Sequence, residues 1–255
     1  MHNEQGSRSI SYPNDWPKGT YIGYLSSSRS RRLHPHRVDV TTEDLIPGQH
    51  HVNPKLNLAL KRCLDVSAAF VLLVLLSPIL LLIAAAIKIT STGPVLFRQH
   101  RYGLNKHRFE IVKFRTMYLS SCDQSGVRQP SQGDGRITPV GRILRKSSLD
   151  ELPQLLNVLR GDMSLVGPRP HVPGMLAGGV LYEELVPGYF ERLRVLPGIT
   201  GLAQVNGLRG GTDNPAAAEA RIAADLEYID HWSLLLDLKI LIKTVQCEFL
   251  SGSGC

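Results

Sequence analysis

The apolar run VSAAFVLLVLLSPILLLIAAAI fills residues 66–87 and contains no charged side chain. As a single α-helix it would be roughly 33 Å long, which is enough to cross the hydrocarbon core of a bilayer. Ser77 and Pro78 lie at its centre. Because proline removes a backbone hydrogen bond and clashes with the preceding turn, it predicts a kink or a break there. The run is therefore either a kinked spanning helix or a helix-break-helix hairpin that enters and leaves the membrane by one face.

Basic residues flank this run on both sides. Lys61 and Arg62 precede it, and Lys88, Arg98 and Arg101 follow it. Positive charge prefers the cytoplasmic side of a membrane. A spanning helix would place one basic flank outside, whereas a re-entrant hairpin keeps both flanks on one side, with each half roughly 15 Å long. The charges favour the hairpin, which we assign to residues 56–92, and they leave the spanning helix as the alternative.

The overall composition limits the classes of function. The chain has 255 residues and a formal net charge of +7, which favours an anionic partner such as nucleic acid, an acidic membrane surface or a phosphate-rich ligand. Only 6% of the residues are aromatic, so platforms for stacking bases are not expected, and the apolar run argues against a soluble nucleic-acid-binding protein. The four cysteines form no C-x-x-C pair, so neither a zinc site nor a disulfide framework is predicted.

Residues 1–55 are polar, rich in Ser, Pro, His and Arg, and contain no apolar run. This composition predicts a basic, mostly disordered N-terminal arm rather than a signal peptide. The arm is either solvated or in contact with anionic lipid through basic residues such as Arg29, Arg31, Arg32 and Arg37.

Residues 93–250 are predicted to form a compact α/β domain that is continuous with the hairpin and lies on the membrane surface. Two β-prone runs flank residues 103–106 and predict a β-hairpin within residues 94–117. Residues 118–135 are rich in Ser, Asp, Gln, Gly and Pro and predict a surface loop.

Two helices are predicted near the end of the chain. Asn214 followed by Pro215 combines a capping residue with a first-turn proline, which predicts the start of one helix. The second helix, residues 234–247, is amphipathic: leucines and other aliphatic residues form one face, and Lys239 and Lys243 lie on the other. It either packs into the core or lies in the membrane interface with its lysines toward the headgroups.

The stretch SSLDELPQ, residues 147–154, places two acids side by side ahead of a proline. Ser148 and Glu151 fit a capping box, and Asp150 as the cap would place Pro153 in the third helical position, where its missing N–H does no harm. The spacing favours Asp150 at the mouth of a helix that continues through leucines at i, i+3, i+4 and i+7. A single acidic cap requires no function.

The residues around the acidic pair favour a phosphate site. Arginine side chains recognise phosphate oxygens in fork geometry, and a helix N-terminus adds backbone donors. One carboxylate could attack phosphorus, and one or both could hold Mg²⁺ together with phosphate oxygens. We therefore take Asp150 and Glu151 as catalytic or metal-binding candidates and predict phosphate binding by Lys113, Arg115, Arg142, Arg145 and Arg169.

An ordered series of motifs extends over residues 55–247. It consists of KRCLDV (61–66), Ser77-Pro78, GPVLFRQHRYG (93–103), KFRTM (113–117), RITPVGRILRKSSLDELPQLLNVLRGDMSLVGPRP (136–170) and PGITGLAQVNG (197–207). With these motifs the chain resembles the bacterial sugar transferases, the monotopic phosphoglycosyl transferases that prime exopolysaccharide and O-antigen synthesis.

The resemblance implies an enzyme at the cytoplasmic face of the bacterial inner membrane, with both ends of the hairpin cytoplasmic. The family moves a sugar 1-phosphate from a UDP-sugar to undecaprenyl phosphate and releases UMP. Asp150 matches the family's nucleophile, which forms a phosphosugar–aspartate intermediate, and Glu151 would assist through Mg²⁺ or through proton handling. Arg145 and Arg169 match arginines expected to hold phosphates. Around the foot and tip of the hairpin, the resemblance assigns lipid-phosphate or membrane roles to Lys61, Arg62, Asp65, Ser77 and Pro78.

The sequence after residue 200 resembles members that transfer glucose 1-phosphate, because Leu208 separates Gly207 from Arg209 where galactose-type members have arginine directly. Galactose 1-phosphate or an N-acetylated sugar phosphate is the alternative donor group. Two other hypotheses stay open: direct attack by the lipid phosphate with the acids as metal ligands only, and a non-catalytic membrane anchor for polysaccharide assembly. The expected partners are the UDP-sugar, undecaprenyl phosphate and inner-membrane lipid, and no nucleic acid is expected. Monomer and homo-oligomer both stay open.

Overall fold

The computed structural model describes residues 54–119 and 133–250. The predicted arm of residues 1–55 lies almost entirely outside this part of the chain, and so does most of the predicted loop 118–135. The described residues combine helices with three separate two-stranded sheets. The mixed α/β class is therefore confirmed.

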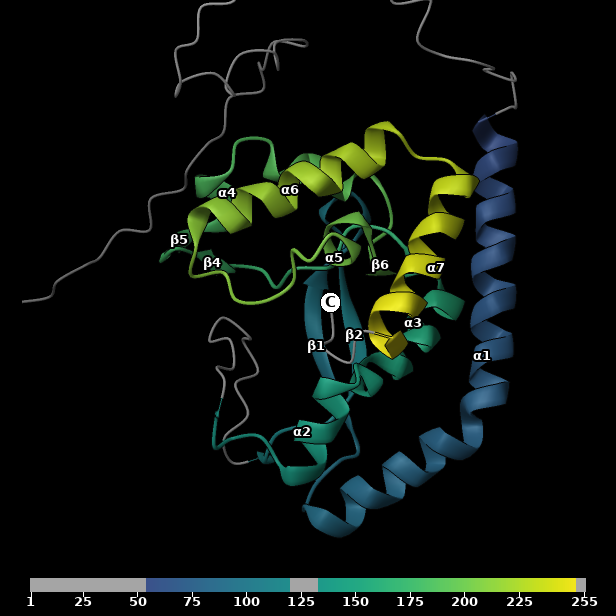
Figure 1. The fold of residues 1–255 in the computed structure, drawn as a ribbon, viewed down its shortest axis with the longest axis vertical. Coiled ribbons are helices and arrows are strands. Elements are labelled where there is room, and N and C mark those ends of the chain that lie inside the picture. Colours follow the sequence, from purple (N-terminus) through teal and green to yellow (C-terminus); the bar gives the residue numbers. More distant parts are fainter. Residues whose placement is uncertain (1–53, 120–132, 251–255) are drawn as a thin grey trace, which may run out of the picture. The chain divides into compact units, whose positions relative to one another are not determined.

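The apolar run lies within helix α1, Pro54–Thr90, which has 37 residues and contains Pro78. Of the kink or break expected at Pro78, the structure has a bend within one helix, and Figure 1 shows α1 as two limbs that point in different directions. The re-entrant topology in a membrane stays a prediction. A proline inside a helix is the usual cause of such a bend. The Ser77 hydroxyl donates to the Val74 carbonyl at 2.8 Å, so it satisfies an acceptor one turn before the proline.

Most of the apolar surface of α1 is not covered by the rest of the described chain. In the part of the chain that the structure describes, Leu56–Thr90 is the one helix long and apolar enough to cross a membrane. Its most apolar stretch of 18 residues has a mean hydropathy of 3.0, and 11% of that stretch is buried. Residues such as Leu75, Leu81 and Ile89 are more than two-thirds exposed. An apolar surface of this extent favours contact with lipid over water.

The predicted β-hairpin is confirmed. Strands β1, Leu96–Tyr102, and β2, Arg108–Phe114, pair antiparallel, and the short 3₁₀ helix η1, Leu104–Lys106, joins them with Asn105 and Lys106 at positive φ. The other two sheets are small. The parallel pair consists of β3, Ser164–Val166, and β6, Gly198–Thr200, and the antiparallel pair consists of β4, Leu176–Ala177, and β5, Val180–Leu181.

The remaining helices are mostly short. They are α2, Pro139–Lys146; η3, Leu149–Gln154; α3, Leu155–Arg160; α4, Tyr182–Leu185; η4, Tyr189–Arg194; α5, Leu202–Val205; α6, Pro215–Asp230; and α7, Leu234–Leu250. The predicted cap of α6 is confirmed, since the Asn214 side chain accepts hydrogen bonds from the amides of Ala216 and Ala217.

Helix α7 packs into the core, which is one of the two alternatives that its sequence left open, and its place in the membrane interface stays a prediction. Its buried side carries Asp237 and Ile240, and Ile240 belongs to the core. Leu236 and Leu241 pack against the same core. The helix still presents an uncovered apolar stripe of residues that are more than half exposed, which consists of Leu235, Leu238, Ile242 and Val245.

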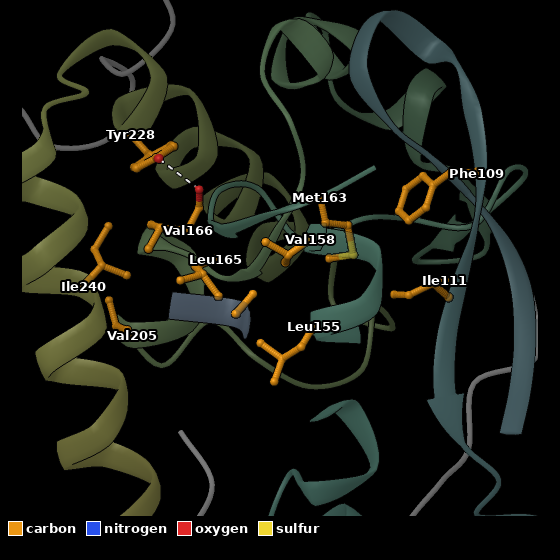
Figure 2. Close-up of a cluster of buried hydrophobic side chains, with 11 residues drawn as sticks. Phe109, Ile111, Leu155, Val158, Met163, Leu165, Val166, Val205, Tyr228 and Ile240 are labelled. Carbon is orange, nitrogen blue, oxygen red and sulfur yellow. Dashed lines mark hydrogen bonds between the residues drawn. The ribbon is translucent and has the colours of Figure 1, made fainter. Parts of the chain in front are cut away.

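One core cluster joins β2, α3, β3, α5, α6 and α7 (Figure 2). Val158 and Met163 are fully buried at its centre. The Tyr228 hydroxyl of α6 donates to the Val166 carbonyl of β3 at 3.1 Å. Ala69 of α1 is also fully buried in this cluster. Helix α1 is therefore part of the same core as the rest of the described domain, and it is not a separate appendage.

Candidate active site

A polar cavity of about 520 Å³ opens between the β1–β2 hairpin, α2, η3, α5 and α6. Its lining includes six residues predicted from the sequence: Lys113, Arg115, Arg145, Asp150, Glu151 and Arg169. The seventh, Arg142, is exposed on α2 and is not among the lining residues. The structure therefore brings the acidic pair and most of the predicted cations together.

The backbone before the acidic pair turns sharply. Ser148 precedes η3 with φ 54 and ψ 13, in the left-handed region, and its side chain makes no capping hydrogen bond. Asp150 is the second residue of η3 rather than its cap. Both capping predictions are therefore wrong, because the chain leaves α2 through a left-handed residue and enters a 3₁₀ helix that carries Pro153 in its interior.

Glu151 is fully occupied by cations. The Lys113 ammonium donates to its Oε1 at 2.7 Å, and the Arg169 guanidinium donates to Oε2 at 3.0 Å and also to Oε1. Burial alone would raise the pKa of Glu151, but the charges and hydrogen bonds of Arg169 and Lys113 outweigh burial and hold the pKa well below its usual range. Glu151 is therefore ionised and locked in place.

Asp150 is in the opposite situation. It is buried, yet no hydrogen bond or salt bridge within the described residues reaches its carboxylate. Burial first, and then the neighbouring Glu151 charge, raise its pKa to about 6, while Lys113, Arg145 and Arg169 act in the opposite direction. At neutral pH the carboxylate is ionised, poorly solvated and unpaired, which is the state expected of a nucleophile.

The predicted arginines differ in how they are used. Arg145 donates from Nε to the Thr116 hydroxyl at 3.0 Å, and its charge acts on Asp150. Arg115 is buried and binds the end of α1: it donates to the Ser91 carbonyl at 2.9 Å and to the Thr92 carbonyl. Arg115 therefore lines the cavity while it also fixes the junction between α1 and β1.

Sequence reasoning missed several lining residues. Arg101 of β1 donates to the Pro170 carbonyl at 3.2 Å and to Oε1 of Gln99 at 2.5 Å. Burial, followed by the nearby Arg169 charge, lowers the pKa of Arg101 to about 10. Alternation along β1 could have found it, since residues 97, 99 and 101 share one face. The other missed lining residues are His171, two positions after Arg169, and four residues from more distant segments: Gln204, Arg209, Arg221 and Asp225.

The three charged residues at the foot of α1 do not line the cavity. Arg62 donates to three carbonyls around the end of α3, those of Val158 at 2.7 Å and of Leu159 and Met163 at 3.3 Å. These bonds bring a charged donor to carbonyls at a helix C-terminus, where the regular intrahelical donors end. Arg62 therefore joins α1 directly to the helix that follows the acidic pair.

Lys61 and Asp65 extend this contact. Lys61 donates to Asp237 of α7 at 2.6 Å and to the Val166 carbonyl at 3.2 Å. Asp65 accepts from the Ser164 hydroxyl at 2.7 Å and from the Leu165 amide at 3.2 Å. These contacts give the foot of α1 a structural role, and its predicted contact with the acceptor phosphate stays a prediction.

The donor set for a metal is small. Within the described residues, no group of three or more His, Cys, Asp or Glu side chains is placed to hold an ion. Of the two predicted ligands, Glu151 already accepts from Lys113 and Arg169, whereas Asp150 has unpaired oxygens. Mg²⁺ often uses only one or two carboxylates and takes its other ligands from substrate phosphates and water, so the site fits a metal that arrives with a phosphate ligand.

Comparison with known proteins decides the family. The family model described as "Bacterial sugar transferase" matches residues 56–251. The chain belongs to the bacterial sugar transferase family. The resemblance drawn from the motifs is therefore confirmed, and the matched range of the bacterial sugar transferases includes α1 as well as the cavity.

Curated relatives support this assignment. The chain is 52% identical over 199 residues to the exopolysaccharide production protein PSS of Rhizobium leguminosarum, covering 78% of this chain and 100% of that protein. It is 56% identical over 187 residues to a UDP-glucose:undecaprenyl-phosphate glucose-1-phosphate transferase of Caulobacter vibrioides, covering 72% and 68%. The protein of the same name in Escherichia coli is 49% identical over 198 residues, covering 78% of this chain and 42% of that longer protein.

Proposed function

We propose that this protein transfers glucose 1-phosphate from UDP-glucose to undecaprenyl phosphate and releases UMP, as the first membrane step of exopolysaccharide synthesis. The observation that carries the proposal is the contrast within the acidic pair: Glu151 is neutralised by two cations, while the Asp150 carboxylate is buried and unpaired beside it. Two of the three relatives above are named for this reaction.

The proposed chemistry proceeds in two displacements at one phosphorus. An Asp150 carboxylate oxygen forms a bond to the sugar-bearing phosphorus, the bond from that phosphorus to the bridging oxygen breaks, and UMP leaves with the electron pair. A phosphate oxygen of the lipid then attacks the same phosphorus and releases the Asp150 carboxylate. A covalent intermediate divides one difficult transfer into two easier ones.

Cations around the acidic pair would stabilise the diphosphate of the donor. Arg101, Arg145 and Arg169 all line the cavity, and guanidinium groups suit the planar, two-point recognition of phosphate oxygens. Mg²⁺, if it is used, would be held by Asp150 and phosphate oxygens, and it would neutralise developing negative charge. Glu151 then acts mainly by holding Lys113 and Arg169 in place.

The reaction requires the cavity to lie at the level of the lipid headgroups. The exposed apolar surface of α1 and the bend at Pro78 fit a re-entrant hairpin in the inner membrane, with both ends on the cytoplasmic face. The apolar stripe of α7, together with the neighbouring Lys239 and Lys243, fits an interfacial helix. A buried catalytic core and an inserted anchor would then share the contact at Lys61, Arg62 and Asp65.

The topology predicts a specific labelling pattern. In a chain without its native cysteines, Leu58→Cys and Ile89→Cys, at positions that are 58% and 84% exposed, should both react with an impermeant thiol reagent in inverted membrane vesicles. Neither should react in right-side-out spheroplasts, because both ends of a re-entrant hairpin face the cytoplasm. Leu81→Cys, from the middle of the lipid-facing surface, serves as the control that stays unlabelled in both. Labelling of the two ends from opposite sides would establish a spanning helix instead.

The function is tested with purified protein, Mg²⁺ and radiolabelled UDP-glucose in the absence of lipid. Label should attach to the protein with release of about one equivalent of UMP, and undecaprenyl phosphate should then discharge the label. An adduct from UDP-galactose but not from UDP-glucose would keep the mechanism and replace the sugar. Turnover with lipid but no adduct with any UDP-sugar would favour direct displacement, and no turnover at all would favour the non-catalytic anchor.

A further inference from the structure

The turn that carries Arg169 is held by its carbonyl groups. Four consecutive carbonyls accept hydrogen bonds from four residues in three different parts of the chain: β1, η4 and β6. The pairs are Pro168 with the Gly198 amide at 3.0 Å, Arg169 with Arg192 Nη2 at 2.6 Å, Pro170 with Arg101 Nη1 at 3.2 Å, and His171 with the Tyr102 amide at 3.0 Å. The turn is therefore fixed from outside rather than by its own secondary structure.

The sequence of the turn explains this dependence. Pro168 and Pro170 flank Arg169 and have no backbone N–H, so the turn has few donors with which to build internal hydrogen bonds. Buried carbonyls must still find partners. Two of the four donors are guanidinium groups, and charged donors make stronger hydrogen bonds than neutral ones.

Arg192 is the most buried of these donors. It comes from η4 and is 1% exposed. Its Nε donates to Oδ2 of Asp225 at 2.9 Å, and its Nη2 lies 2.7 Å from the same oxygen. A buried charge without a partner is strongly unfavourable, so Asp225 of α6 is what allows Arg192 to remain charged beneath the turn.

The side chain and the backbone carbonyl of Arg169 bind different partners. The Arg169 side chain binds Glu151, while the Arg169 carbonyl binds Arg192. We propose that Arg192 is a positioning residue for the transfer reaction: oriented by Asp225, it fixes the backbone of Arg169 and thereby the place from which the Arg169 guanidinium holds Glu151 beside Asp150. This inference rests on the proposed function, and it adds a residue that makes no contact with the acidic pair itself.

The role requires the fork of an arginine. One guanidinium bonds the Asp225 carboxylate and the Arg169 carbonyl in one plane, whereas a lysine ammonium is a compact charge with freely rotating donors. Arg192→Lys keeps the charge opposite Asp225 and should keep the fold. It should loosen the turn, because the lysine ammonium cannot donate to the Asp225 carboxylate and to the Arg169 carbonyl with the geometry of the guanidinium.

The experiment compares Arg192→Lys with Arg194→Lys in the full-length, membrane-extracted protein. Arg194 is two residues away on η4, its side chain is 54% exposed, and it pairs with Glu191 and Asp230 at the surface. Arg192→Lys should lower kcat by about 10- to 100-fold, because small displacements of positioning groups have effects of this size. KM for UDP-glucose should change by less than about threefold, and Arg194→Lys should behave like wild type in both constants.

A further readout separates positioning from a general loss of structure. Hydrogen exchange of the segment 164–175 should be faster in Arg192→Lys and unchanged in Arg194→Lys, whichever sugar nucleotide is the substrate.

Wild-type exchange in segment 164–175 of Arg192→Lys would overturn the inference, as would a raised KM with an unchanged kcat. If Arg192→Lys does not fold, the double variant Arg192→Met with Asp225→Leu removes both buried charges and retains the apolar volume, and the same two readouts apply. An absence of wild-type turnover with UDP-glucose would contradict the proposed function alone, because the exchange result still decides whether Arg192 holds the turn.

Discussion

Asp150→Asn is expected to abolish the phosphosugar adduct and to lower transfer to the lipid by at least about 10³-fold, as removal of a catalytic nucleophile commonly does. The two side chains have the same shape, and no hydrogen bond within the described residues is lost, because none reaches the Asp150 carboxylate. The loss would therefore be chemical rather than structural. Adduct formation from radiolabelled UDP-glucose and steady-state transfer rates measure it.

Stability gives an independent check on this variant. The folded-state pKa of Asp150 is raised to about 6 by burial and by Glu151. A carboxyl group with a raised pKa stabilises the fold below its unfolded pKa, and this contribution is lost as the pH rises through the folded value. At neutral pH the ionised group is thus unfavourable, and the melting temperature of Asp150→Asn should not fall.

Asp162→Asn is the matched control, since Asp162 accepts from the Asn157 amide at 3.3 Å and does not line the cavity. Its transfer rate should stay within about twofold of wild type. An adduct that persists in Asp150→Asn would identify another nucleophile.

Glu151→Gln is expected to change both the rate and its pH dependence. A neutral amide cannot neutralise Lys113 and Arg169, so two cations are left in a largely buried place. The side chains of Lys113 and Arg169 are 16% and 38% exposed. For partly exposed partners, the loss of such an ion pair should lower the free energy of unfolding by roughly 2–3 kcal/mol. Transfer should fall by about 10²-fold, since the cations no longer have a fixed position.

The pH profile gives the sharper result for this variant. In wild type, kcat should fall about tenfold per pH unit below about pH 6, because the Asp150 carboxylate is protonated there. In Glu151→Gln the like charge that raises the pKa of Asp150 is absent, while Lys113 and Arg145 still lower it. The acidic limb should therefore move to lower pH.

Glu110→Gln is the control for charge alone, because Glu110 lies on β2 with its side chain 47% exposed and pairs with Arg98 and His100 at the surface. It should leave the profile unchanged. If the acidic limb of the kcat profile of Glu151→Gln stays in place or moves to higher pH, Glu151 does not control the ionisation of Asp150.

Local sequence signals were sufficient for several parts of the fold. The turn residues around Gly103 predicted the hairpin of β1 and β2, and Asn214 with Pro215 predicted the start of α6. These features depend on residues within a few positions of one another. The acidic pair was also found from neighbours in sequence, since Arg145 and Arg169 lie within twenty residues of it.

Features that depend on distant segments were not predictable in the same way. Arg192 and Asp225 are 33 residues apart, and neither is marked by a local pattern. The contacts of Arg62 with Val158 and of Asp65 with Leu165 join positions 96 and 100 residues apart. The cap of η3 was misjudged for a related reason: tertiary packing places Ser148 in a left-handed conformation that local spacing does not reveal.

The contact between α1 and the catalytic core has a practical consequence for protein production. A fragment that begins at β1 would lose the fully buried Ala69, would leave the carbonyls at the end of α3 without Arg62, and would expose Asp237 without Lys61. Truncation would thus damage the support beneath the acidic pair instead of yielding a water-soluble enzyme. Work on this catalytic centre should accordingly keep the whole of α1 in a detergent, a nanodisc or a native membrane.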